Sequence, residues 1–232
     1  MSGSPSVQAY LDRIEHHGST EPDLATLAAL QRAHMLAVPF ENLDIHLGRR
    51  LVLDQAVNYR KIVERRRGGW CFELNGLFAW LLAELGFEVT PLGSRVDGSQ
   101  GAGDDLAHLL LQVDLDQPYV VDVGFGEGSF DPLPLAALPD GVISHLDDLT
   151  VVFTTQPRRL DEFQPMCDHL QTSPESPFVR RRVAHRALPD GRITLRERTF
   201  TEERAEQRTE RELAGDDEWR AVLRDRFGIE LG

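Results

Sequence analysis

The sequence predicts an α+β fold in which a mostly helical N-terminal part precedes a part made of antiparallel strands. Apolar residues recur with helical spacing through the first 86 residues, and short strand-like runs replace them from Phe87 onward. Two pairs of these runs are each joined by a tight turn, as in β-hairpins. The 232 residues suffice for one large domain or for two to three small ones, and they contain no internal repeat.

Three helices are expected before residue 67. The first begins near Val7 and ends near Gly18. The second follows a capping sequence at residues 20–23 and ends at Pro39, and the third covers residues 56–66. The segment between the second and third helices is non-repetitive, with a short extended piece at residues 51–53.

Residues 40–43 form an apolar, acidic and amide cluster within that segment. Two interpretations of Glu41 stay open. In one, Glu41 and Asn42 cap the next turn. In the other, Glu41 is the buried partner of Arg67 and holds the approach to Cys71 in place.

A fourth helix is expected to begin at or near Cys71. Its apolar residues share one helical face, and Gly86 stands where a helix commonly ends: Leu74, Leu77, Phe78, Leu81, Leu82 and Leu85. Unpaired N–H groups and the helix dipole favour a thiolate at Cys71, and three arginines at residues 65–67 act in the same direction. The alternative is a buried, inert cysteine. We favour the reactive cysteine because the helix start, the glycines and the cations coincide.

Residues 107–115 and 119–123 are expected to form a hairpin around Asp116. In that register position 108 lies opposite position 124, and Asp122 is its diagonal neighbour on the same face. His108 and Asp122 are therefore predicted to form a hydrogen bond, unless a bulge shifts the register.

The glycine-rich run at residues 124–128 follows the second strand of this hairpin. It lacks the lysine of a P-loop and a following helix, so it matches phosphate-binding motifs poorly. Either it is a flexible exit from the strand, or it is a wall where the backbone approaches a ligand closely. A surface loop is expected at residues 97–105, before this hairpin. After it we expect a strand at 149–154, a second hairpin made of 178–187 and 192–200, an exposed charged segment at 201–212, and a final helix at 216–227.

The composition excludes several classes of function. A net charge of −13 argues against nucleic acid or an anionic membrane surface as the main partner. Two cysteines, Cys71 and Cys167, are too few for a disulfide framework or a four-cysteine zinc site, and a reduced cytosolic state is expected. With no signal sequence and no long apolar run, we expect a soluble, cytoplasmic protein.

Cys71, His108 and Asp122 supply the parts of a nucleophilic triad. The thiolate attacks, the imidazole moves the proton, and the carboxylate orients the ring. These parts predict acyl transfer or hydrolysis through a thioester. On the residues alone, a protease, a transglutaminase and an acyltransferase all remain open.

At this level of detail the chain resembles the arylamine N-acetyltransferase family. The matching segments occur in the family's order and cover most of the chain: residues 14–47, 66–78, 107–109, 121–126 and 176–179. The resemblance implies ping-pong acetyl transfer from acetyl-CoA, through Cys71, to an arylamine or hydrazine, without a metal. It also implies a cysteine-protease-like core with a helical domain (1–86), a shortened antiparallel β-barrel (87–170) and a C-terminal α/β lid (171–232).

The resemblance further implies roles for residues around the triad. Phe40, Phe125 and Phe178 would line the acceptor pocket, and Gly124 and Gly126 would lie near the CoA entrance. Family members are usually longer, and the shortfall falls between residues 126 and 168.

Two alternative functions remain at this stage. One is an amide synthase that releases a carrier-bound polyketide by aminolysis, for which a shortened barrel leaves room. The other is a non-catalytic descendant that binds a ligand or partner through the same cleft. The three intact triad residues count against the second alternative, because binding alone does not require them all.

Overall fold

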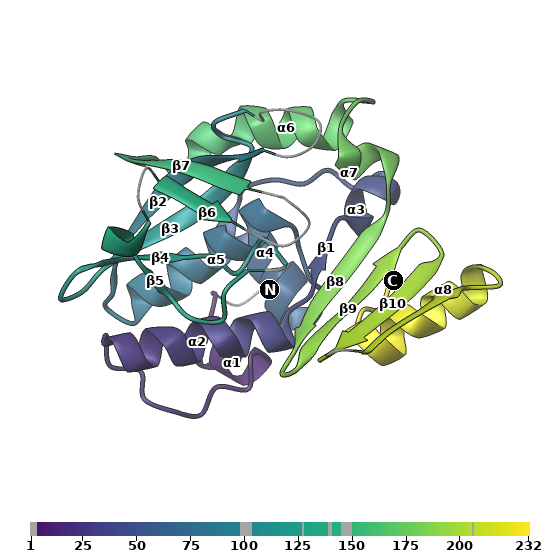
Figure 1. Ribbon diagram of the computed structural model, residues 1–232, viewed down its shortest axis with the longest axis horizontal. Coiled ribbons are helices and arrows are strands. Elements are labelled where there is room, and N and C mark those ends of the chain that lie inside the picture. The colour runs from purple at the N-terminus through teal and green to yellow at the C-terminus, as the bar shows by residue number, and fades with distance from the viewer. Residues whose placement is uncertain (1–3, 98–103, 127, 139–140, 145–149, 206) are drawn as a thin grey trace.

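Two antiparallel sheets lie on either side of a helical layer (Figure 1). The computed structural model describes residues 4–97, 104–126, 128–138, 141–144, 150–205 and 207–232. Its main helices are α1 (Val7–Arg13), α2 (Leu24–Ala37), α3 (Leu43–His46), α4 (Gln55–Tyr59), α5 (Cys71–Glu84), α6 (Gln164–Thr172), α7 (Pro177–Arg180) and α8 (Asp216–Val222). Helical turns continue α4 as η1 (Arg60–Glu64) and α8 as η6 (Leu223–Phe227), and short 3-10 helices form η2 (Leu135–Ala137) and η5 (Leu160–Phe163).

The first sheet has six strands in the order β5-β4-β3-β2-β7-β6 and is curled into a half-barrel. Its strands are β2 (Glu88–Asp97), β3 (His108–Asp114), β4 (Pro118–Val121), β5 (Leu133–Pro134), β6 (Val142–Ser144) and β7 (Thr150–Pro157). In the β3–β4 hairpin Leu111 lies opposite Val121, which is the predicted register. Continuing that register places position 108 beside position 124.

The second sheet has five strands in the order β1-β8-β9-β10-β11. They are β1 (Phe40–Glu41), β8 (Val183–Leu188), β9 (Gly191–Arg196), β10 (Thr199–Arg204) and β11 (Gln207–Glu212). α8 covers one face of this sheet, where Trp219, Val222 and Phe227 bury their side chains against strand residues. Because β1 pairs with β8, the second sheet joins the helical part of the chain to its C-terminal part.

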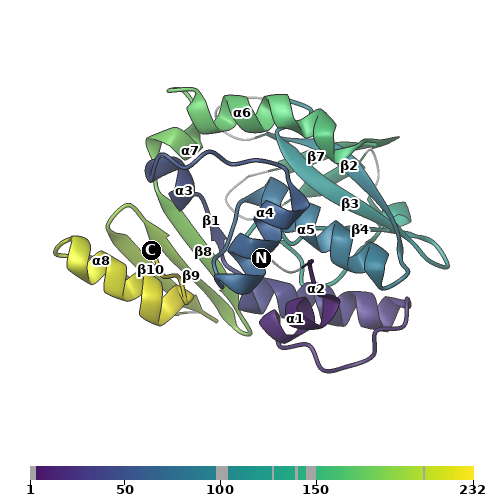
Figure 2. The same cartoon turned by 180° about the vertical axis from the view of Figure 1, so that it is seen from behind.

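Helix α5 lies at the centre of the molecule, between the half-barrel and the N-terminal helices (Figure 2). Its inward side chains are buried together with residues of α1, α2, β3 and β4; examples are Leu77, Phe78 and Leu81. The predicted helix from Cys71 is therefore confirmed. The predicted helices at the N-terminus, at 56–66 and at 216–227 are also present, within a few residues of the expected ends.

Two sequence-based expectations were wrong in the C-terminal part. Phe178 does not begin a strand, because Ser176 and Pro177 start the short helix α7. Residues 192–200 form two strands, since Glu197 adopts a left-handed conformation (φ 53°) and reverses the chain. The charged segment 201–212 is largely exposed, as expected, and it also pairs as the end of β10 and β11, with cross-strand charge pairs such as Glu203 and Arg208.

Residues 51–53 form no strand, because their backbone amides donate hydrogen bonds to side chains of α6. This helix was not predicted from the sequence. Gln171 of α6 accepts a hydrogen bond from the Leu51 amide at 2.8 Å, and Gln164 accepts one from the Leu53 amide at 3.0 Å. Within the predicted loop 97–105, residues 98–103 lie outside the described residues. The strand predicted at 149–154 is β7, and its first residue also lies outside them.

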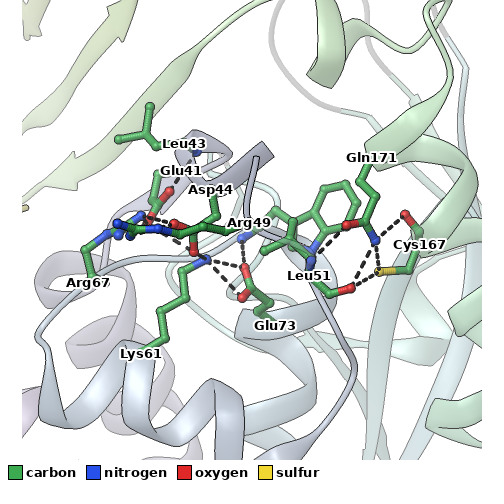
Figure 3. A network of polar contacts seen from close by, with 11 residues as sticks. Glu41, Leu43, Asp44, Arg49, Leu51, Lys61, Arg67, Glu73, Cys167 and Gln171 are labelled. Atoms are coloured by element: carbon green, nitrogen blue, oxygen red, sulfur yellow. Dashed lines mark hydrogen bonds and ion pairs between the residues drawn. The ribbon is translucent and has the colours of Figure 1, made fainter. Parts of the chain in front are cut away.

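A buried network of five charged residues fixes the approach to α5 (Figure 3). Arg67 donates to Glu41 at 2.7 Å and to Asp44 at 3.1 Å. Lys61 donates to Glu73 of α5 at 2.8 Å and contacts Asp44 at 3.0 Å. Burial lowers the pKa of Lys61, but the surrounding carboxylates outweigh burial and raise it above its ordinary value. The interpretation of Glu41 as the buried partner of Arg67 is confirmed.

Replacing Arg67 with Met should destabilise the protein by about 3–5 kcal/mol, because two buried carboxylates would lose their partner. Urea unfolding of the wild type and the variant measures this difference. The matched control is Arg65→Met, whose side chain is exposed, and it should leave the free energy of unfolding almost unchanged. A loss below about 1 kcal/mol in Arg67→Met would show that the network contributes little to stability.

Candidate active site

Cys71 is the first residue of α5, and its local structure depends on two glycines. A side chain at Gly68 would collide with the Pro39 carbonyl oxygen, 2.1 Å from the ideal Cβ position, and one at Gly69 would collide with Glu73. This close approach lets Gly69 accept a hydrogen bond from the Glu41 amide at 2.8 Å. Glu73 accepts a hydrogen bond from the Trp70 amide at 3.2 Å and so completes the start of the helix. Cys71 is consequently held, almost fully buried, at a rigid helix start.

His108 and Asp122 meet beside Cys71 in the arrangement that the hairpin register predicts. The Nε2 atom of His108 lies 2.7 Å from Oδ2 of Asp122. Cys71 is among the groups that raise the pKa of His108, so its thiol lies close to the ring. Because Nε2 is engaged with Asp122, Nδ1 is the ring nitrogen left for the thiol.

The electrostatics of the pair favour a charged imidazole. Burial alone would lower the pKa of His108, but the Asp122 carboxylate and the Cys71 contact raise it above its ordinary value. Burial would raise the pKa of Asp122, yet His108, Asn75 and the Gly124 amide together hold it below its usual range. The site therefore retains the ion pair inside an apolar environment.

Asn75 fixes the positions of both strand residues relative to the helix. It lies one helical turn after Cys71 and is fully buried. Its Nδ2 donates to the Leu109 carbonyl at 2.7 Å and to Asp122 Oδ1 at 2.8 Å, while its Oδ1 accepts from the Val123 amide at 2.9 Å. One amide side chain thus connects α5 to β3 and to the end of β4.

Gly124 and Gly126 pack against the protein itself. A Cβ at Gly124 would lie 2.7 Å from Cys71 Cα and 2.7 Å from Asn75 Nδ2. At Gly126 (φ 86°) it would lie 3.2 Å from the His185 ring. The Gly124 amide donates to Asp122 Oδ1 at 2.7 Å. The close approach at these two glycines is to the protein's own atoms, so the approach of a ligand to this run, and a contact with CoA, remain predictions.

The three predicted pocket aromatics all lie near the cysteine and the histidine. Phe125 packs edge-on against the His108 ring, with centroids 5.5 Å apart. Phe40 and Phe178 are partly buried in the hydrophobic cluster that contains Cys71, with their centroids 6.4 Å apart. Their roles toward an acceptor remain predictions.

The three arginines before the helix do not act together on Cys71. Arg67 directs its charge into Glu41 and Asp44, so two carboxylates balance it close to the cysteine. Arg65 and Arg66 are exposed. The charge of Arg67 is therefore balanced locally, whereas Arg65 and Arg66 face the solvent.

Two residues near the site escaped the sequence analysis. Asn75 stands four positions after Cys71, and this spacing, which puts both on one helix face, was the available signal. His185 lies opposite Phe40 in the β1–β8 pair, and its Nδ1 is 3.0 Å from Thr194 Oγ1. Nothing in the sequence pairs residues 40 and 185, because β1 is only two residues long.

Cys71 and Cys167 are both free and buried. Among the described residues, no cluster of three or more histidine, cysteine or acidic side chains is placed to hold a metal ion. Within the same ranges, every helix is too short or too polar to cross a membrane.

Comparison with known proteins extends these observations. The N-acetyltransferase family model matches residues 23–145 and 150–232. The pineal gland isozyme NAT-3, an arylamine N-acetyltransferase of Gallus gallus, is 35% identical over 97% of this chain and 94% of that protein. The alignment spans 273 positions, so that relative carries residues with no counterpart among the 232 here.

Solved structures agree with the sequence comparison. The arylamine N-acetyltransferase of Nocardia farcinica is 36% identical, with a TM-score of 0.89 over 98% of this chain and 90% of that one. The Mycobacterium marinum enzyme in complex with CoA is 33% identical, with a TM-score of 0.86 over 97% and 93% of the two chains. By its sequence and its fold, the chain belongs to the arylamine N-acetyltransferase family.

Proposed function

We propose that the protein transfers an acetyl group from acetyl-CoA to an arylamine or hydrazine through a thioester on Cys71. The observation that carries this proposal is the position of the His108 ring, which lies 2.7 Å from Asp122 and close enough to Cys71 for the thiol to raise the pKa of the ring. Membership of the family supports acetyl-CoA as the donor, as does the CoA complex of the Mycobacterium marinum relative.

In the first half-reaction, Cys71 and His108 act as a thiolate–imidazolium pair. The sulfur attacks the acetyl carbonyl carbon, and the negative charge moves to the carbonyl oxygen. Free amides in the first turn of α5 are suited to stabilise that oxygen. The carbon–sulfur bond to CoA then breaks, and His108 gives its proton to the departing CoA sulfur.

In the second half-reaction, the amine nitrogen attacks the acetyl-cysteine carbonyl carbon. His108, now neutral, takes the proton that the amine nitrogen loses. The bond to Cys71 breaks, the sulfur leaves as a thiolate beside the imidazolium, and the amide product is released. Protons and charges balance over the cycle, and no step requires a metal.

Asp122 and Asn75 have supporting roles in this mechanism. Asp122 stabilises the charged ring and holds its tautomer, and Asn75 positions Asp122 relative to the helix that carries the nucleophile. We further propose that Phe40, Phe125 and Phe178 form an acceptor wall, with the Gly124 and Gly126 backbone near the incoming CoA. The two free thiols suit a reducing compartment such as the cytoplasm.

Acetyl-CoA alone should acetylate Cys71 when no amine is present, because the first half-reaction does not need the acceptor. Mass spectrometry of the intact protein and its peptides locates the group. Addition of an arylamine should then release it as the N-acetyl product. The variant Cys71→Ser should form no adduct, whereas Cys167→Ser should react as the wild type does.

An unmodified Cys71 after incubation with acetyl-CoA would refute the acetyl-transfer mechanism. If a carrier-bound acyl thioester modifies Cys71 where acetyl-CoA does not, the amide synthase alternative gains support. If neither donor reacts, the non-catalytic alternative is favoured.

The imidazole of His108 should stay protonated well above pH 6.5, and Asp122→Asn should lower its pKa by about one pH unit or more. The pKa of His108 in the folded protein lies above its pKa in the unfolded chain. The pair's contribution to stability is therefore complete below about pH 6.5 and is lost as the pH rises through the folded value. NMR titration of ¹⁵N-labelled histidine measures the shift. Asp114→Asn, at the far end of β3, is the matched control and should leave the titration of His108 unchanged.

The variant Gly124→Ala should slow acetylation of Cys71 by about tenfold to a hundredfold, because its Cβ would displace Cys71 or Asn75. Rapid-quench mass spectrometry gives the rate. The control is Gly128→Ala, whose Cβ would find its nearest atom at 3.7 Å, an ordinary contact. Equal rates for the two variants would contradict the importance of this close approach.

A further inference from the structure

A second cleft lies between the N-terminal helices and the C-terminal sheet. One end of α2 lies close to one end of β8 in both views (Figures 1 and 2). Residues of both elements line the cleft, which has a volume of about 650 Å³. This volume is within the range of small-molecule sites. Cys71, His108 and Asp122 are not among its lining residues.

The walls of this cleft concentrate positive charge in an acidic protein. Four arginines from four separate segments line it, with Glu15 as the one carboxylate among the lining residues: Arg13, Arg32, Arg66 and Arg186. The chain as a whole carries a net charge of −13. A convergence of cations against that background is the electrostatic signature of an anion site.

Two of the four arginines are engaged within the protein. Arg13 is 4% exposed, and it donates to the carbonyls of Ile62, at 3.0 Å, and Ala37, at 2.9 Å, with no carboxylate bonded to it in the described part of the chain. Burial, and secondarily Arg66, lowers the pKa of Arg13 to about 10. Arg32 lies over the Phe130 ring, 4.5 Å from its centroid. Both contribute charge to the cleft.

The other two arginines are available to a ligand. Within the described residues, neither the Arg66 nor the Arg186 side chain forms a hydrogen bond or an ion pair. The Nε atom of Arg186 is buried without an acceptor, and leaving a charged donor unsatisfied in this way is costly. Its neighbour Arg226 is already paired with Glu202 at 2.6 Å. An anion at this position would give Arg186 the acceptor that it lacks.

The remaining lining is apolar. Small and aliphatic residues of α2 form one side of this lining: Ala29, Ala33, Leu36 and Ala37. Leu188 at the end of β8 and Pro189 in the turn after it also line the cleft. Such a surface favours a flat or aliphatic body over a fully hydrated ion such as free phosphate.

We propose that this cleft binds an organic anion, with an aryl or acyl body on the apolar floor and a carboxylate, sulfonate or phosphate group between Arg66 and Arg186. Guanidinium groups pair with such anions in a bidentate geometry. The site is separate from the acetyl-transfer centre, and its existence does not depend on the proposed reaction.

Calorimetric titration with naphthalene-2-carboxylate tests the proposal. The neutral analogue 2-naphthamide has the same ring system and should bind at least about tenfold more weakly, because it forms no charge-assisted pair. The double variant Arg66→Gln/Arg186→Gln should weaken the carboxylate by about tenfold or more. The control is Arg65→Gln/Arg224→Gln, which removes the same charge outside the cleft and should bind as the wild type does.

Three results would overturn the proposal. They are equal affinity for the carboxylate and the amide, unchanged affinity in the cleft double variant, and displacement of the probe by saturating CoA. Displacement would assign the arginines to the CoA site instead. The variant Cys71→Ser, which lacks the nucleophile, should bind the probe as the wild type does. The binding test therefore does not depend on whether the acetyl-transfer mechanism is correct.

Discussion

The buried charge network around Lys61 and Arg67 is the constraint on which the active site depends. It draws carboxylates from three separate elements onto two cations, namely Glu41 of β1, Asp44 of α3 and Glu73 of α5. β1 also pairs with β8, so the same network ties the helix of the nucleophile to the second sheet. Charges this deeply buried are tolerated only when each is paired, and an imperfect arrangement is strongly penalised. The start of α5 is therefore restricted to one position.

A second connection sets the nucleophile against its base. Asn75 joins α5 to the β3–β4 hairpin through three hydrogen bonds and so fixes the distance between them. Because Gly124 has no side chain, the end of the hairpin can contact the Cys71 backbone. Each connection acts on a different side of the helix. The network orients α5 toward the second sheet, and Asn75 orients it toward the half-barrel. The triad residues lie where these two alignments meet.

The features that could be predicted from the sequence are those that depend on residues close together in the chain. The helix from Cys71 follows from apolar spacing, and the contact of His108 with Asp122 follows from hairpin register alone. The Glu41–Arg67 pair was one of the two interpretations of Glu41, but nothing in the sequence indicated that Lys61 would join it through Asp44 and Glu73. Similarly, the end of β10 and all of β11 are polar or charged, so their cross-strand pairing has no alternating apolar signal. Non-local pairing, rather than weak propensity, limited the prediction.

The shorter length of this chain is compatible with an unaltered triad geometry for a structural reason. The family match is interrupted at residues 146–149, within the segment where the sequence predicted the shortfall. That segment supplies β5, which pairs with β4 at one edge of the half-barrel, and β6 and β7, which extend the half-barrel beyond β2 at the other edge. The hydrogen bonds that position His108 and Asp122 come from β3, β4 and Asn75, which lie on the other side of β2. A shortfall at the β6–β7 edge would change the outer wall of the half-barrel and leave in place the hydrogen bonds that join Asn75, Asp122 and His108.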